Sequence, residues 1–162
     1  MRRRVSFRRT YLIRAGETVK LGPLTIRAFE GRHFRPNNHK GIASLAYHIS
    51  AEDAPSLAFP GDVRDFRLTP GCAMPPADYC FAHVWLGDDN CLEEEYPLLP
   101  DYARYMLQFS QKNIFLTHLL ENSRTNEQMW RDYHAHLVAR QIRALSPQTT
   151  VRTPRRGEVI SL

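Results

Sequence analysis

The sequence contains few cysteines and no long hydrophobic run. Its three cysteines, Cys72, Cys80 and Cys91, do not form a CxxC zinc pattern, and one thiol stays unpaired if any disulfide forms. Reduced thiols in the cytoplasm are therefore the simpler expectation. No apolar stretch approaches the roughly 18 to 20 residues that a membrane span needs, and no secretory hydrophobic segment is visible. These absences predict a cytoplasmic protein without a membrane partner.

Several common catalytic motifs are also missing. No Gly-x-Ser-x-Gly elbow supplies a serine nucleophile, and the glycines form neither a GxGxxG nor a P-loop pattern. The composition, with 43% hydrophobic and 24% charged residues, is ordinary for a globular protein. A chain of 162 residues without repeats or a linker predicts a single domain over residues 1–162.

Positive charge gathers at both ends of a chain whose net charge is +5. The basic residues concerned are Arg2, Arg3, Arg4, Arg8, Arg9, Arg14, Arg152, Arg155 and Arg156. Such clusters can bind phosphates, so a basic nucleic-acid-binding protein is one hypothesis. The alternation in Arg4–Arg8 instead indicates a half-buried strand with arginines on its wet face, and no RNA-recognition signature accompanies it. We favour the strand.

The hydrophobic pattern predicts an α/β fold with a mixed sheet flanked by helices. A first helix is expected from an N-cap at Asp101 to about Phe109. A second is expected along the apolar stripe from Trp130 to Leu145, where Ser146-Pro147 stops it. Strands are expected at 18–21, 24–30, 44–50, 56–59, 79–85, 113–118, 149–152 and 158–161.

Two of these strands end on residues that can bind metals. Leu57–Asp62 is an apolar run that stops at a glycine and a carboxylate, and Asn113–His118 is an apolar run that ends on an imidazole. Sheets of α/β proteins place their active sites at the carboxyl ends of strands. A carboxylate oxygen and an imidazole nitrogen at one edge predict a metal-dependent hydrolase.

A family resemblance rests on these residues and their neighbours. The stretches Ala28–His33, Ser44–Ile49 and Phe59–Asp62, followed by Ala77–His83 and Leu116–His118, resemble the second half of a metallo-β-lactamase-fold hydrolase. The resemblance covers most of the chain in the family's order. It implies part of an αββα sandwich. The family's His-x-His-x-Asp-His motif, which lies upstream of these stretches, is absent, so the resemblance implies a domain lacking its amino-terminal half.

The resemblance also implies a site. His33, Asp62 and His118 match the family's metal ligands, with Asp62 as the catalytic bridging carboxylate and one or two zinc ions as the cofactor. His39 could replace His33, because both lie in one polar loop. His83 and Asp88 are weaker candidates for contacting substrate, and His134 on the second helix is expected at the surface.

The expected function is that of a metal-dependent hydrolase-like protein of the metallo-β-lactamase superfamily, truncated or inactive on its own. If active, it would hydrolyse a small-molecule ester, amide or phosphodiester. Expected protein partners are a second copy in a homodimer or a complementing amino-terminal chain. The alternatives are a non-catalytic interaction module and the nucleic-acid-binding protein.

Overall fold

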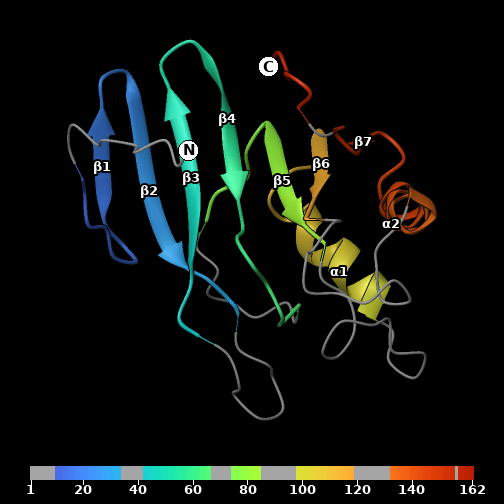
Figure 1. The fold of residues 1–162 in the computed structure, drawn as a ribbon. Helices are drawn as coiled ribbons and strands as arrows, with labels where there is room; N and C mark the ends of the chain where they lie inside the picture. The colour runs from blue at the N-terminus through green and yellow to red at the C-terminus, as the bar shows by residue number, and fades with distance from the viewer. Residues whose placement is uncertain (1–9, 34–41, 67–73, 85–97, 119–131, 156) are drawn as a thin grey trace, which may run out of the picture.

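The computed structural model describes residues 10–33, 42–66, 74–84, 98–118, 132–155 and 157–162. These residues form a mixed sheet of seven strands whose spatial order, β1 to β7, is also their order in the chain. Figure 1 shows the strands side by side from β1 to β7, with both helices at the β5–β7 end. The predicted α/β fold with a mixed sheet flanked by helices is therefore confirmed.

The strands alternate in sequence with the two helices only in the second half of the chain. The bounds are β1 Thr18–Leu21, β2 Leu24–Glu30, β3 Leu45–Ala51, β4 Ala54–Phe59, β5 Tyr79–His83, α1 Leu98–Leu107, β6 Asn113–Thr117, α2 Asp132–Leu145 and β7 Thr150–Arg152.

Strand directions explain where a site can form. β1 to β4 form an antiparallel meander, and β4, β5, β6 and β7 run parallel to one another. Since β3 is antiparallel to both β2 and β4, β2 runs in the direction of the parallel group. The carboxyl ends of β2, β4, β5 and β6 therefore lie along one edge of the sheet.

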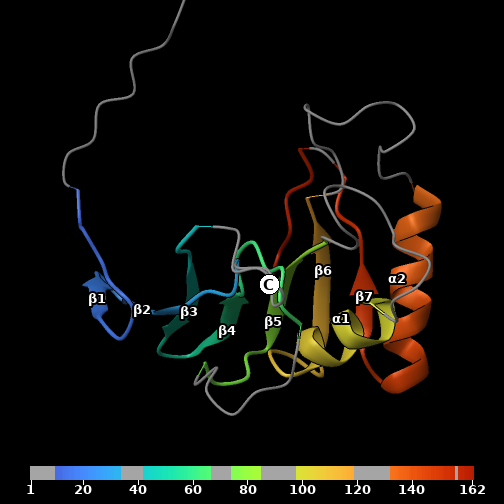
Figure 2. The same ribbon diagram turned by 90° about the horizontal axis from the view of Figure 1, so that it is seen from below.

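One face of the sheet packs against the helices. Cross-strand pairing places Ala58, Cys80 and Ile114 side by side on this face, which we call the helix face. They share one buried core with residues of α1, such as Tyr102 and Met106, and of α2. Figure 2 shows both helices on the same side of the sheet. The burial of this apolar surface is the main stabilising term that the fold offers.

The opposite face carries apolar and aromatic side chains in every strand from β1 to β6. Phe59 stacks on Phe81 with ring centroids 4.7 Å apart, Phe81 contacts Phe115 at 5.2 Å, and Phe115 stacks on Tyr79 at 5.8 Å. Phe115 is buried but is not part of the core beneath the helices. We call this surface the open face.

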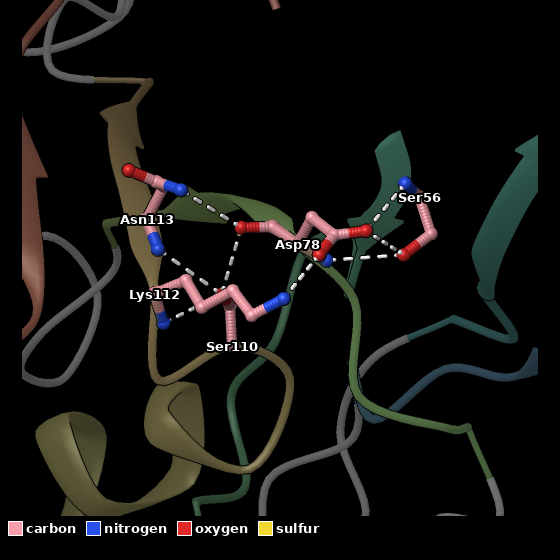
Figure 3. Close-up of polar contacts among 5 residues, drawn as sticks. All are labelled: Ser56, Asp78, Ser110, Lys112 and Asn113. Carbon is pink, nitrogen blue, oxygen red and sulfur yellow. Dashed lines mark hydrogen bonds and ion pairs between the residues drawn. The ribbon is translucent and has the colours of Figure 1, made fainter. Parts of the chain in front are cut away.

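The amino-terminal edge of the parallel strands is held by polar contacts around Asp78 (Figure 3). Its carboxylate accepts hydrogen bonds from the backbone N–H and the hydroxyl of Ser56, at 2.9 and 2.8 Å. It also pairs with the Lys112 ammonium at 2.6 Å, while its carbonyl accepts bonds from Ser110 and Asn113. Asp78 thus joins residues of β4 and β6 from a position just before β5.

The predicted elements differ from the structure mainly at their ends. α1 begins at Leu98, before Asp101, so Asp101 lies in the first turn and pairs with Arg104 instead of capping the helix. A proline in the first turn is tolerated, because its missing N–H would have no partner there. Residues 158–161 were expected to form a strand but form none; Glu158 instead bonds back to the Arg155 backbone, through its N–H and its carboxylate. The strand expected at Arg4–Arg8 lies outside the described residues.

Candidate functional site

Three histidines and one aspartate meet at the carboxyl edge of the sheet. His33 Nε2 lies 3.0 Å from Asp62 Oδ2, and His83 Nδ1 lies 3.0 Å from Asp62 Oδ1. His83 Nε2 in turn faces His118 Nδ1, and the two rings pack edge to face with centroids 3.7 Å apart. The four side chains follow or end β2, β4, β5 and β6, so each comes from a different strand.

Asp62 is positioned by a tight turn after β4. Gly61 has a φ of +77°, and a Cβ at this position would come within 2.8 Å of the Leu45 carbonyl oxygen. Only glycine combines that backbone conformation with so close an approach to a neighbouring strand. Gly61 therefore allows the chain to turn beside β3 and present Asp62 at the edge.

The segment carrying His33 is tied to the segment carrying Asp62. The Arg32 carbonyl accepts hydrogen bonds from the backbone N–H groups of Arg64 and Asp65, at 2.8 and 3.3 Å. The Arg32 guanidinium also pairs with the Asp65 carboxylate at 2.7 Å, and both side chains are largely buried. The contacts hold His33 and Asp62 next to each other.

His83 and His118 are positioned by the last residues of β5 and β6. The Val84 N–H donates to the Thr117 carbonyl at 3.1 Å, and the Thr117 hydroxyl donates to the Ala82 carbonyl at 3.1 Å. The next residue, His118, has a backbone φ of +64°, a conformation that residues other than glycine seldom adopt. Such strain is found most often where the surrounding structure fixes a functional group. The turn brings the His118 ring back onto His83.

The environment of Asp62 favours its ionised form. Burial opposes the charge, but contact with His83 and the charges of His83, His33 and His118 outweigh it and lower the pKa of Asp62. Asp62 Oδ1 is buried, and His83 Nδ1 lies 3.0 Å from it. An ionised carboxylate held beside imidazole nitrogens is a candidate ligand for a cation.

The structure brings together the three residues named from the sequence, His33, Asp62 and His118, and adds His83. His83 was expected to be an ordinary sheet residue or a weak substrate contact, because the apolar pattern continued to Trp85. The sequence pattern that indicates His83 is the one that indicated His118: a histidine follows an apolar run, here Tyr79–Ala82. In the structure β5 stops at this histidine.

The structure describes two of the remaining candidates, His134 and Cys80, and places them outside this cluster. His39 and Asp88 lie outside the described residues. His134 contacts Tyr133 on α2, with ring centroids 3.8 Å apart. Cys80 is fully buried beneath the helices, and burial raises the pKa of its thiol, so it does not act as a thiolate.

The donor set fits a zinc ion by its chemistry, although the side chains contact one another directly. Imidazole nitrogens and carboxylate oxygens are ligands that zinc takes together, and the cluster supplies both. As they are arranged, the described residues contain no group of three or more histidine, cysteine, aspartate or glutamate side chains that could enclose a metal. His33 Nδ1 accepts a 3.4 Å bond from the Ile42 N–H, which leaves Nε2 as the protonated nitrogen. If His33 bound zinc through Nε2, its proton would have to move to Nδ1, and the hydrogen bond from the Ile42 N–H would break.

The terminal arginines are described only in part. Arg152 pairs with Glu158 at 2.6 Å and lies over the ring of Phe115, so it belongs to the edge of the sheet. Arg2, Arg3, Arg4, Arg8, Arg9 and Arg156 lie outside the described residues, so nucleic-acid binding stays a prediction. Among the helices that the structure describes, none is long and apolar enough to cross a membrane.

Comparison with known proteins gives the fold. No family model and no curated protein matches the chain in sequence. The structure aligns with a mutant of the CmlA β-hydroxylase (13% identity, 87% of this chain, 31% of that chain, TM-score 0.54). It also aligns with an isothiocyanate hydrolase from Delia radicum gut bacteria (12% identity, 93% of this chain, 59% of that chain, TM-score 0.52).

A third structural neighbour is the metallo-β-lactamase fold protein YhfI from Bacillus subtilis, with 13% identity, 90% of this chain and 52% of that chain covered, and a TM-score of 0.49. At these identities the first two neighbours support the α/β fold and define no activity. The chain spans only 31%, 59% and 52% of the three neighbours in turn.

Proposed function

We propose that the chain is a metallo-β-lactamase-fold protein of the metal-dependent hydrolase type. The observation that carries the proposal is the convergence of His33, Asp62, His83 and His118 from four strand ends on one edge of the sheet. Such a group at the carboxyl ends of strands is typical of a catalytic site in an α/β protein. The expected substrate class is a small-molecule ester, amide or phosphodiester.

His33, Asp62, His83 and His118 would hold a zinc ion. When bound, zinc acts as a Lewis acid and lowers the pKa of a water ligand to about 7. The low pKa of Asp62 keeps its carboxylate charged at neutral pH, which suits a cation ligand.

The protein's own groups also allow proton movement at this edge. His83 faces Asp62 through Nδ1 and His118 through Nε2, so its two ring nitrogens connect the two side chains. An imidazole in this position can take a proton at one nitrogen and release one from the other. We assign His83 the role of holding a proton beside Asp62, in addition to any ligand role.

Zinc binding by the purified chain tests the proposal. We expect isothermal titration and elemental analysis to give one zinc ion per chain. Asp62→Asn should weaken binding at least about tenfold, because even outer-shell partners of a metal contribute that much. Zinc should also raise the melting temperature of the wild type more than that of Asp62→Asn, since ligands stabilise the folded state that binds them.

Asp101→Asn is the matched control. Asp101 is a partly exposed aspartate on α1 that pairs only locally with Arg104, so this change should leave zinc binding intact. Equal zinc affinity in wild type and Asp62→Asn, with both folded by circular dichroism, would contradict the proposal. Hydrolysis of ester, amide and phosphodiester probes is then measured on the zinc-loaded chain.

The alternative is a non-catalytic interaction module that keeps this fold. Its support is that the described residues, as they are arranged, contain no group of three or more histidine, cysteine, aspartate or glutamate side chains that could enclose a metal. A folded chain that takes up no zinc would favour this alternative.

A further inference from the structure

The register of the sheet determines which side chains occupy its open face. Residues directly opposite each other on paired strands point to the same side, and alternate residues along a strand follow them. The pairs Val19↔Ile26, Ile26↔Ile49, Ile49↔Leu57 and Leu57↔Tyr79 therefore form one apolar row across five strands. A second row runs through Ala28, Tyr47 and Phe59, and Phe59 stacks on Phe81.

The open face differs from the helix face in charge as well as in packing. At described strand positions from β1 to β6, its ionisable residues are Glu30 and His83, which lie at the carboxyl ends of β2 and β5. The helix face carries Lys20 and Arg27 on β1 and β2, where neither described helix covers it. An uncharged, apolar centre with charges at the margin is the composition of a protein–protein interface.

Side chains on the open face remain partly accessible. Ile26, Tyr47, Ile49, Phe59 and Phe81 are each half-buried, and both described helices contribute to the core on the other side. A sheet with one face in the core normally has polar residues on its solvated face, so an apolar open face is incompatible with permanent exposure to water.

We propose that the open face binds the open face of a second copy of this chain, so that the two sheets pack face to face in a symmetric dimer. Two-fold symmetry makes the surface its own partner, and packed sheets interdigitate such side chains about 10 Å apart. Six strands of about five residues give a footprint on the order of 500 Å² per copy. Two copies would then bury on the order of 1,000 Å², which reaches the lower limit for a biological interface and fits a dimer in equilibrium with its monomer. The inference does not depend on metal binding.

Sedimentation velocity over a concentration series tests the proposal on the full chain. We expect a monomer–dimer equilibrium for the wild type. Ile49→Lys should weaken the dimer at least about tenfold, because two lysines would be buried in each symmetric interface. Tyr133→Lys is the control, since Tyr133 is an exposed hydrophobic residue on α2 and far from this face in the fold. It should leave the dimer unchanged.

Hydroxyl-radical footprinting provides a readout that needs no variant. Oxidation of Tyr47 and Phe81 should fall as the wild-type chain is concentrated, while oxidation of Tyr133 should not. A folded chain that stays monomeric at high concentration would overturn the proposal, as would a dimer that survives Ile49→Lys and dissociates in Tyr133→Lys. If Tyr47 and Phe81 are protected from oxidation only when a different protein is added, the open face does not bind a second copy and the proposal is wrong.

Discussion

Asp78 joins the amino ends of three strands, so replacing it should destabilise the sheet far from the candidate site. Asp78→Ala removes two hydrogen bonds from Ser56 and the ion pair with Lys112. Hydrogen bonds to charged groups contribute about 1.5–3 kcal/mol each, and exposed ion pairs about 1 kcal/mol or less. The Asp78 side chain is 34% exposed, which reduces these values. We expect Asp78→Ala to lower the free energy of unfolding by about 2–3 kcal/mol and the melting temperature by roughly 4–10 °C.

The pH dependence gives the same prediction a second measurable form. The Lys112 ammonium, followed by the Ser56 hydrogen bonds, holds the pKa of Asp78 well below its usual range. A carboxyl whose pKa is lower in the folded state stabilises that state above its unfolded pKa, which is about 3.9. The stabilisation disappears as pH falls through the folded pKa. The difference between wild type and Asp78→Ala should therefore be constant from about pH 5 to pH 8 and shrink below about pH 4.

Urea unfolding followed by circular dichroism at several pH values measures both effects. Asp101→Ala serves as the control, because it removes another carboxylate whose ion pair is local and contributes about 0.5 kcal/mol or less. If Asp78→Ala costs no more than this control at neutral pH, the contacts in Figure 3 do not hold the strands together. A difference that stays constant down to about pH 2 would refute the role of the ionised carboxylate.

Two further predictions concern buried positions. The Tyr102 hydroxyl is buried beneath the sheet without a hydrogen-bond partner within the described structure, so Tyr102→Phe should raise the free energy of unfolding by up to about 1 kcal/mol. Chemical denaturation measures this, and a loss above about 1 kcal/mol would show that the hydroxyl is bonded in solution. Gly61→Ala should lower the free energy of unfolding by about 2 kcal/mol or more. The alanine would need a positive φ, and its Cβ would meet the Leu45 carbonyl. An unchanged melting temperature would mean that the turn after β4 relaxes freely.

The sequence predicted most of the sheet and three members of the cluster because both depend on local pattern. Short apolar runs closed by glycine or a polar residue indicate buried strands, and Asp62 and His118 stand directly at such ends. His83 was placed within its strand because Val84 and Trp85 continue the apolar run. Where β5 stops depends on its pairing with β6, in which Thr117 is the last partner. That pairing is a tertiary property that a single sequence does not contain.

The predicted ends of other elements failed for similar reasons. The side-chain acceptor of Asp101 before a periodic apolar pattern suggested that the first helix begins there, yet the first turn tolerates Pro100 and α1 begins at Leu98. The alternation in residues 158–161 is typical of a strand, but a strand forms only where a neighbour offers backbone partners. The helix face could be recognised from apolar periodicity. The open face became apparent only from the register across six strands.

The identity of spatial and chain order in the sheet has a consequence for how the molecule assembles. Every strand pairs with the strands just before and after it, so no strand is inserted between two that have already formed. Each new strand can add to the growing edge as it leaves the ribosome, at the cost of closing only the loop that precedes it. The four strand ends that carry His33, Asp62, His83 and His118 would then be brought together in that sequence. The cluster is complete only when β6 has joined, so its formation reports the last steps of sheet growth.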